Sequence, residues 1–269
     1  APYSQLDPKP YDPAVDAHID MYISSWRESM PVKSHGALVE RSILTPGDPT
    51  APKTRGAVLK YVSRFVRASL GAGETTSPTT LSGEQEIFYI LSGRGEIAGK
   101  TARVELKPGV AALVPPGIPF TMTNTGEATL TMFLLAEPVP QGFEAQKDIV
   151  VADENTLPWN LANPHWTGLS KILFTPKNGL ATVQSVLSVQ FDPMTFFQPH
   201  SHREGAEEVW TAITDNCYFL LGKQIRSQPP GTAYYIPPDG KTPHANFNVS
   251  DDRVKLFYFS RLNNPEIKK

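Results

Sequence analysis

Apolar and polar residues alternate over several short stretches of the chain. Residues 57–70 (AVLKYVSRFVRASL) and 181–191 (ATVQSVLSVQF) place apolar side chains at about every second position, the spacing that gives a β-strand two different faces. Residues 86–91 (EIFYIL) and 111–116 (AALVPP) are short apolar runs followed closely by Gly or Pro. With 26 prolines and 19 glycines spread over 269 residues, this pattern predicts many short strands and few helices.

The strand pattern occurs twice. Residues 82–93 (SGEQEIFYILSG) align with residues 204–215 (EGAEEVWTAITD), which places Glu86 on Glu208 at an offset of 122. In both copies a glycine precedes the glutamate and a hydrophobic run follows it. The alignment therefore predicts equivalent strands in the two halves of the chain.

Two further pairs of segments support a duplication. Residues 107–117 align with 228–240 at the same offset of 122, and residues 35–46 align with 165–176 at an offset of 130. A constant offset across separate motifs indicates two copies of one unit. The break between them lies near residues 136–148.

Each copy is typical of a small antiparallel barrel, because closure of short strands into a barrel removes exposed sheet edges. The sequence predicts an all-β fold of two tandem antiparallel β-barrels, built as jelly rolls with few short helices. We assign residues 1–30 to an N-terminal arm, 31–140 to the first barrel, 141–262 to the second and 263–269 to a tail. The leading segment 16–30 supplies either a short helix or an edge strand on the other copy, and the sequence leaves both open.

Charge narrows the range of partners. Lys and Arg number 25 against 27 Asp and Glu, a net charge of −2 without blocks of one sign. Nucleic-acid and anionic-membrane surfaces need clustered positive charge, so neither partner is expected. The sequence contains no run of 18 apolar residues, so it predicts no membrane-spanning helix. A small-molecule substrate is the partner that we expect, and packing between barrel faces leaves a homodimer open.

Cysteine content limits the metal chemistry. Cys217 is the only cysteine, which excludes an intramolecular disulfide and a zinc cage of thiolates, so a metal would need N and O ligands. We expect Cys217 to be a small buried hydrophobic residue. The chain begins at Ala1 within a proline-rich stretch, which leaves the compartment open between cytoplasm and periplasm or secretion.

The stretch PHSHREGAEEVW contains the main candidate chemistry. His200 and His202 are two residues apart, so they share one face of a strand. Glu207 and Glu208 follow on opposite faces of the next strand, so only one can join the histidines. The spacing alone favours Glu207, whereas the alignment with Glu86 favours Glu208. We choose Glu208, because a turn absorbs an extra residue more easily than a strand changes register.

These residues resemble the metal site of the cupin superfamily, specifically that of the two-domain bicupins. The family's two motifs combine Gly, His-x-His, Glu and Gly, and then Gly, Pro-x-Gly, His and Asn. The second copy matches them at these positions: His200, His202, Glu208, Gly231, Pro237, His244 and Asn248. It departs from them in three ways, since five residues separate His202 from Glu208, Asp215 replaces a glycine, and two extra residues precede His244.

The resemblance implies that His200, His202, Glu208 and His244 bind one divalent metal ion. Three imidazoles and a carboxylate suit Fe, Mn, Ni, Co or Zn and leave open coordination positions, without distinguishing among these metals.

The first copy lacks this ligand set. Pro78, Thr80 and Phe120 stand where the second copy has its three histidines. Glu86 alone remains, and one carboxylate does not hold a transition metal. We expect a structural barrel or an apolar pocket lined by Phe88 and Phe120. His18, His35 and His165 lie outside the motifs, and the matching positions of His35 and His165 suggest a shared structural role.

Strand alternation also predicts the surroundings of the metal. The expected substrate-binding residues are Phe196, Trp210, Tyr218, Asn246 and Arg203. Glu207, if it is not a ligand, is the candidate catalytic proton relay.

The sequence predicts a metal enzyme that acts on a small organic substrate. The resemblance to cupins implies dioxygenases, sugar isomerases, epimerases, lyases and decarboxylases as chemistries, and the aromatic, weakly charged lining favours a dioxygenase-type oxidoreductase. A metal-dependent sugar isomerase, epimerase or lyase is one alternative. A non-catalytic small-molecule-binding or storage-like bicupin is the other, because a fold does not determine a function.

Overall fold

The computed structural model describes residues 18–162 and 167–262. These residues form 21 strands and no α-helix, with three short 3₁₀ helices, η1 (Ile19–Tyr22), η2 (Trp26–Glu28) and η3 (Pro176–Asn178). In this part of the chain no helix has the length and apolar character needed to cross a membrane. The predicted all-β fold of two tandem antiparallel barrels is confirmed.

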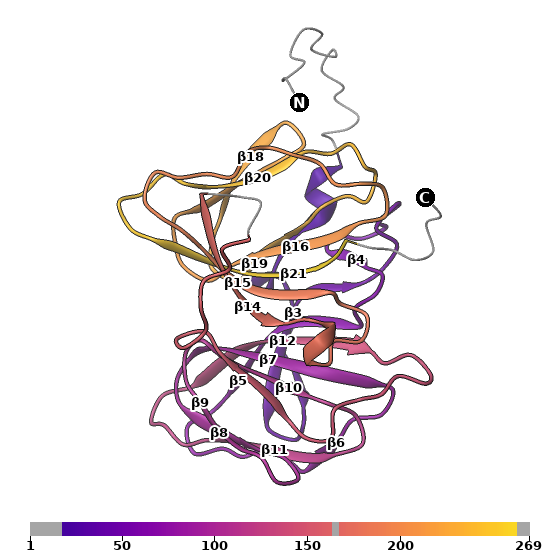
Figure 1. Cartoon of the computed structure of the whole chain (residues 1–269), viewed down its shortest axis with the longest axis vertical. Helices are drawn as coiled ribbons and strands as arrows, with labels where there is room; N and C mark the ends of the chain where they lie inside the picture. The colour runs from indigo at the N-terminus through magenta and orange to yellow at the C-terminus, as the bar shows by residue number, and fades with distance from the viewer. Residues whose placement is uncertain (1–17, 163–166, 263–269) are drawn as a thin grey trace, which may run out of the picture.

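Four sheets are stacked along the long axis of the molecule (Figure 1). The first half of the chain supplies most of two of them. Its large sheet has the order β13 (Val150–Asp153), β10 (Val110–Val114), β7 (Glu84–Ser92), β12 (Leu130–Pro138), β5 (Arg64–Leu70), β3 (Leu38–Pro46) and β2 (Val32–Ser34), and β4 (Ala57–Leu59) pairs with β3. Its small outer sheet has the order β6 (Thr79–Thr80), β11 (Pro119–Asn124), β8 (Gly95–Ala98) and β9 (Arg103–Leu106).

The second half repeats this arrangement. Its large sheet has the order β1 (Ile23–Ser25), β19 (Thr232–Tyr235), β16 (Glu207–Ala212), β21 (Val254–Arg261), β15 (Ser185–Phe191) and β14 (Gly168–Phe174). Its small outer sheet consists of β18 (Gln224–Gln228), β17 (Cys217–Leu221) and β20 (His244–Asn248). Each half is therefore a barrel flattened into two sheets, with its small sheet at one end of the molecule.

The two halves exchange edge strands. β1, from the start of the chain, pairs with β19 of the second half, and β13, which follows the break between the copies, pairs with β10 of the first. Both alternatives for the leading segment therefore occur, since it forms two 3₁₀ helices and an edge strand. The domain boundaries at 30/31 and 140/141 stay predictions. β1 and β13 each pair with a strand on the other side of one of these boundaries. Residues 1–17 of the arm, His165 and the tail 263–269 lie outside the described residues.

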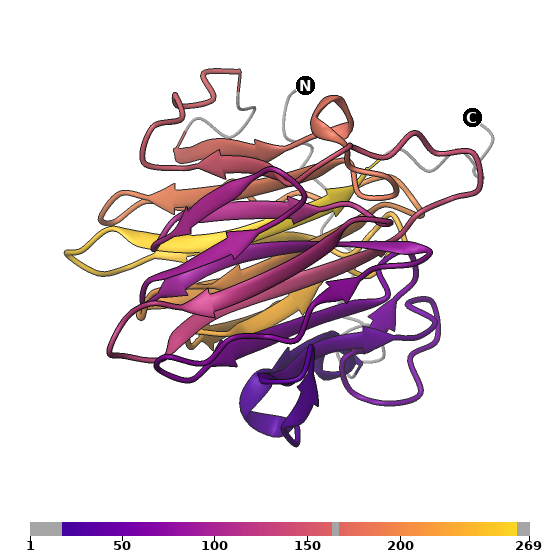
Figure 2. The same ribbon diagram turned by 90° about the horizontal axis from the view of Figure 1, so that it is seen from below.

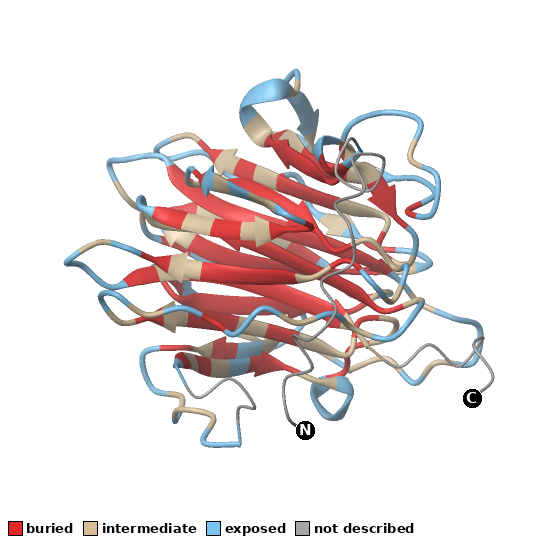
Figure 3. Cartoon of the chain, turned by 90° about the horizontal axis from the view of Figure 1, so that it is seen from above, coloured by how far each residue is buried: buried red, intermediate tan, exposed pale blue. Residues whose placement is uncertain are grey.

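The two large sheets pack face to face, and strands of successive sheets run in similar directions (Figure 2). Each central strand is consequently buried on both faces, as the continuous red of these strands shows (Figure 3). This explains the continuous apolar runs, because one set of side chains fills its own barrel and the other fills the contact between barrels. Phe65 of the first half meets Phe257 and Phe259 of the second, with ring centroids 6.0 and 5.1 Å apart.

Replacing Phe65 by Ala is expected to lower the free energy of unfolding by about 3–5 kcal/mol. The side chain is fully buried and contacts rings from both halves, so its removal leaves a cavity at the contact between barrels. Urea unfolding followed by tryptophan fluorescence measures the change. The control Ile225→Ala alters a side chain that is 62% exposed on the outer strand β18, and it is expected to cost less than about 0.5 kcal/mol. Equal losses in the two variants would contradict the assigned role of Phe65.

Candidate metal centre

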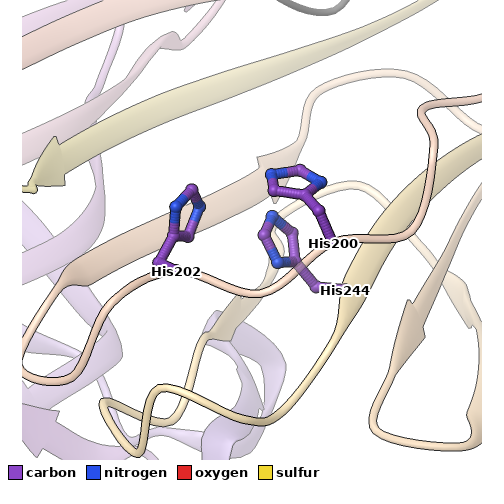
Figure 4. Close-up of side chains that lie close together, drawn as sticks. All are labelled: His200, His202 and His244. Carbon is purple, nitrogen blue, oxygen red and sulfur yellow. The ribbon is translucent and has the colours of Figure 1, made fainter. Parts of the chain in front are cut away.

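Two separated segments of the second half meet inside its barrel. His200 lies in the segment before β16, and His244 is the first residue of β20. An isolated antiparallel bridge joins them, with backbone N–H···O distances of 3.2 and 2.9 Å in the two directions. His202 follows on the same segment as His200, and the three imidazoles lie around one space (Figure 4). The bridge thus places the two segments in the register that brings their side chains together.

Glu208, the second residue of β16, completes the group. Its Oε2 lies 2.7 Å from Nε2 of His202, and its Oε1 lies 3.0 Å from Nε2 of His244. The ring centroid of His200 is 5.0 Å from that of His202 and 4.3 Å from that of His244. One nitrogen from each of the three rings lies within 4.8 Å of the others. Three imidazole nitrogens and a carboxylate therefore converge on one small region.

These residues fit a divalent metal ion of the first transition row. Nε2 of His202 and Nε2 of His244 are buried, yet neither makes a hydrogen bond of ordinary geometry to a described residue, despite the short distances to Glu208. Buried nitrogens normally have a partner, so their arrangement is explained if the nitrogens and the carboxylate share an ion between them. Within the described ranges this is the one group of three such side chains close enough to hold a metal.

Neighbouring groups hold the carboxylate and the first histidine in place. Trp210 Nε1 donates a hydrogen bond to Oε1 of Glu208, and the hydroxyl of Tyr258 donates to Oε2 at 3.1 Å. Nδ1 of His200 lies 2.9 Å from the carbonyl oxygen of Gln198, a contact that suits Nδ1 as donor and leaves Nε2 for the site. The sequence reasoning missed Tyr258, because nothing in its hydrophobic strand distinguishes it from core residues.

Electrostatics favour an ionised carboxylate at Glu208. Burial alone would raise the pKa of Glu208, but the adjacent imidazoles of His244 and His202 outweigh burial and hold that pKa well below its usual range. Burial, reinforced by the charge of Glu208, raises the pKa of Tyr258 well above its usual value. Tyr258 therefore stays protonated and serves as a hydrogen-bond donor to the carboxylate.

A pocket of about 200 Å³ opens beside the carboxylate. Its walls are mostly apolar, and the side chains that line it are Asn160, Ser170, Leu187, Val189, Phe197, His202, Glu208, Trp210, Tyr258 and Leu262. His202 and Glu208 are thus reachable by a small molecule from one side, while His244 is fully buried. Such an arrangement leaves room for a substrate next to the ion.

Comparison with known proteins agrees with this fold. Residues 66–136 match the family described as Cupin domain. The structure is similar to that of AerE from Microcystis aeruginosa, with a TM-score of 0.66 and 11% identity, over 90% of this chain and 100% of that chain. The family match identifies residues 66–136 as a cupin domain, and the structural likeness shows the cupin fold over most of the chain. The matched residues lie in the first cupin barrel, outside the histidine cluster.

Two other solved structures show how widely this cupin fold is used. The bacterial pirin YhhW from Escherichia coli, solved in complex with nickel(II), has a TM-score of 0.64 and 10% identity, covering 90% of this chain and 99% of that one. The 7S globulin of Momordica charantia has a TM-score of 0.68 and 12% identity, covering 91% and 85%. At these identities the likeness concerns the fold alone. No curated protein sequence matches the chain.

Three of the predicted substrate-binding residues lie at or near the second cupin barrel's site. Trp210 lines the pocket. Asn246 is buried on the same face of β20 as His244 and accepts a hydrogen bond of 2.7 Å from the hydroxyl of Tyr234. Arg203 is exposed on the turn that follows the histidines. Contact of these residues with a substrate stays a prediction.

Phe196 is not where strand alternation places it. It is 55% exposed and stacks on Phe247 at a centroid distance of 6.1 Å, whereas its neighbour Phe197 is buried and lines the pocket. The alternation fails because residues 192–199 form turns and a single bridge instead of a continuous strand. Phe197, and not the predicted substrate-binding residue Phe196, therefore lines the pocket.

Tyr218 is also misassigned, by one residue. It pairs with Phe247 on the outer face of the small sheet, while Phe219 faces the barrel interior and stacks on Tyr234 at 4.4 Å. Cys217 shares the inner face and is buried, as the sequence predicts. Burial raises the pKa of its thiol to about 11.

Glu207 does not serve as the predicted proton relay. The pleat of β16 turns it away from Glu208, toward the contact between the barrels. There it accepts a hydrogen bond of 3.1 Å from the backbone N–H of Lys60. Burial raises the pKa of Glu207. Its role is a structural contact between the two cupin barrels.

The first cupin barrel contains an imidazole that the motifs do not predict. His35 lies in the turn between β2 and β3 with φ of +47°, and its Nε2 is 3.1 Å from Oε2 of Glu86. The expectation that Glu86 stands alone is therefore wrong, and Arg64 pairs with the same carboxylate. Phe88 and Phe120 do face this interior, and both pack on the His35 ring. The sequence did not predict this contact, because His35 and Glu86 are far apart in sequence and no motif contains both.

We expect about one metal ion per chain in protein purified without an affinity-tag metal, as measured by elemental analysis. His202→Ala and His244→Ala each remove a ligand and are expected to abolish stoichiometric binding. His35→Ala, which removes the imidazole of the first barrel, is the matched control and is expected to retain the metal. A second metal that is lost in the His35 variant would contradict a single site.

The His35–Glu86 pair is expected to make stability depend on pH. Burial alone would lower the pKa of His35, but the adjacent carboxylate of Glu86 outweighs burial and raises that pKa. A raised folded-state pKa means that the contribution is fully present below about pH 6.5, the unfolded value, and is lost as pH rises through the folded value. The loss of unfolding free energy caused by His35→Gln should therefore be larger at pH 6 than at pH 9. A pH-independent loss in urea denaturation would refute this.

Proposed function

We propose that the second cupin barrel binds one divalent first-row metal ion through His200, His202, Glu208 and His244. We propose further that the protein acts there on a small organic substrate as a dioxygenase-type oxidoreductase. The observation that carries the proposal is the convergence of three imidazoles and a buried carboxylate beside an apolar pocket. The nickel(II) held by the structurally similar pirin supports a metal in this fold.

The chain's own residues position the candidate metal ligands and form the walls of the substrate pocket. When bound, the metal would act as a Lewis acid and offer open positions to O₂ or to substrate oxygen atoms. Trp210 and Tyr258 hold the carboxylate of Glu208 by hydrogen bonds, which keeps the ligand set in one geometry before a substrate arrives. Apolar walls exclude water and leave a flat or aromatic substrate body in van der Waals contact.

The character of the walls favours oxidation of a largely apolar molecule over sugar chemistry. Phe197, Leu187 and Val189 form much of the lining, and only Asn160 and Ser170 add polar groups away from the candidate ligands. No lysine or arginine lines the pocket in the described part of the chain. A sugar has hydroxyl groups on every side and a sugar phosphate needs a cation, so both would leave polar groups unpaired here.

Oxygen uptake by iron- or manganese-loaded protein tests the reaction. Catechols, diketones and keto acids are offered in turn, and consumption of O₂ in stoichiometry with product is expected for one of these classes. His244→Ala, which removes a ligand, should show none. Aldose–ketose interconversion without O₂ consumption would support the isomerase alternative instead. A protein without metal and without turnover would support the binding or storage alternative.

Leu187→Trp separates metal binding from use of the pocket. Leu187 lines the pocket and is not one of the candidate ligands, so the larger side chain should fill the substrate space while the metal content stays at the wild-type level. We expect kcat/KM to fall by at least about tenfold. Unchanged turnover with normal metal content would show that the substrate does not enter this pocket.

A further inference from the structure

A second cavity lies in the groove between the two barrels, apart from the metal centre. It has a volume of about 270 Å³ and shares no lining residue with the pocket beside Glu208. Trp26 and Arg27 of η2 and Arg67 of β5 form one side of it. Leu91 of β7 and Ile213, which follows β16, occupy equivalent positions in the two repeats and lie on its walls. Both halves of the chain therefore contribute to it.

Three arginines gather around Trp26 at this groove. The guanidinium carbons of Arg67, Arg27 and Arg41 lie 4.5, 4.7 and 5.8 Å from the centroid of the indole ring. Arg41 and Arg67 are directly opposite each other on the antiparallel strands β3 and β5. Like charges in directly opposed positions destabilise a sheet, so this arrangement costs folding free energy unless another group offsets it.

No carboxylate of the described residues offsets this charge. Arg27 donates to the carbonyl oxygen of Pro230 at 2.6 Å and Arg41 to that of Ser29 at 2.7 Å, but none of the three forms an ion pair there. Glu28, the nearest acidic residue in sequence to Arg27, pairs with Arg55. Burial and the charges of Arg27 and Arg41 lower the pKa of Arg67. Among residues 18–162 and 167–262, the groove thus holds concentrated positive charge, and Arg67 makes no ion pair with a carboxylate there.

The second barrel approaches this cluster through a glycine. Gly231 has φ of +76°, and a Cβ at this position would lie 2.3 Å from Cδ1 of Trp26. Only glycine combines that backbone conformation with so close an approach. The loop therefore seats Trp26 against the second barrel, and Arg27 and Arg67 line the cavity beside it.

We propose that this groove binds a small organic anion, whose carboxylate or phosphate head group pairs with Arg67 and Arg27 and whose apolar body packs on Leu91, Phe133 and Ile213. A planar guanidinium presents two parallel N–H donors to either head group. The apolar wall beside the cations favours an organic anion over an inorganic one. The proposal is independent of the reaction at the metal centre.

Isothermal titration of the full-length His244→Ala protein tests the site without interference from the metal centre. Phenylacetate and phenyl phosphate serve as probes, with phenylacetamide as the neutral analogue and inorganic phosphate as the anion without an apolar body. We expect one or both organic anions to bind and the amide not to bind. The stronger of the two identifies the preferred head group. Inorganic phosphate that binds as tightly as phenyl phosphate would overturn the apolar part of the proposal.

Substitutions then locate the binding. Arg67→Gln and, separately, the exposed Arg27→Gln are expected to weaken binding by at least about tenfold. Arg253→Gln removes an arginine that is paired with Asp192 elsewhere on the second barrel, and it should leave binding unchanged. Arg67→Gln is also expected to raise or preserve the melting temperature of the anion-free protein, because it removes the opposition to Arg41. Unchanged affinity in both groove variants, or no binding of either organic anion to the unsubstituted groove, would overturn the site.

Discussion

Strand β16 lies between two buried environments, and its pleat assigns each of its side chains to one of them. Glu208 and Trp210 face the interior of the second barrel, whereas Glu207 and Val209 face the contact with the first. A carboxylate on each face needs its own partners, because a buried charge without them is unstable. On one face these are the imidazoles of His202 and His244, and on the other the partner is the backbone N–H of Lys60. The chemistry of the site thus depends on which residues of β16 point into the second barrel, and packing between the barrels fixes that choice.

The two barrels have a glutamate at the same position, but different side chains surround it in each. Glu86 and Glu208 occupy equivalent strands and are both buried. In the second barrel two segments deliver imidazoles to Glu208, whereas in the first a turn residue, His35, and Arg64 neutralise Glu86. An arginine beside the carboxylate satisfies its charge without an ion. The two barrels show how one strand framework supports either a ligand set or an internal ion pair.

Regular alternation made part of this structure predictable from the sequence. The duplicated strands, the choice of Glu208 over Glu207 and the grouping of the histidines all follow from the register of β16 and from the motifs. Prediction failed where the backbone is irregular, as at Phe196, or where one residue decides the face, as at Tyr218. The contacts of His35, and the opposition of Arg41 to Arg67, depend on pairings between distant segments that no local pattern contains.

Exchange of β1 and β13 makes each half of the molecule incomplete without the other. If the chain were cut near residue 140, the second half would lose the strand that covers β19, and the first would lose the strand that covers β10. Each fragment would then present a row of unsatisfied backbone N–H and C=O groups, the kind of edge that recruits further chains into aggregates. The exchange of these two edge strands therefore favours folding and unfolding of the two barrels as one cooperative unit. Evolution of either barrel alone, by loss or recombination, would first require a new edge to be built.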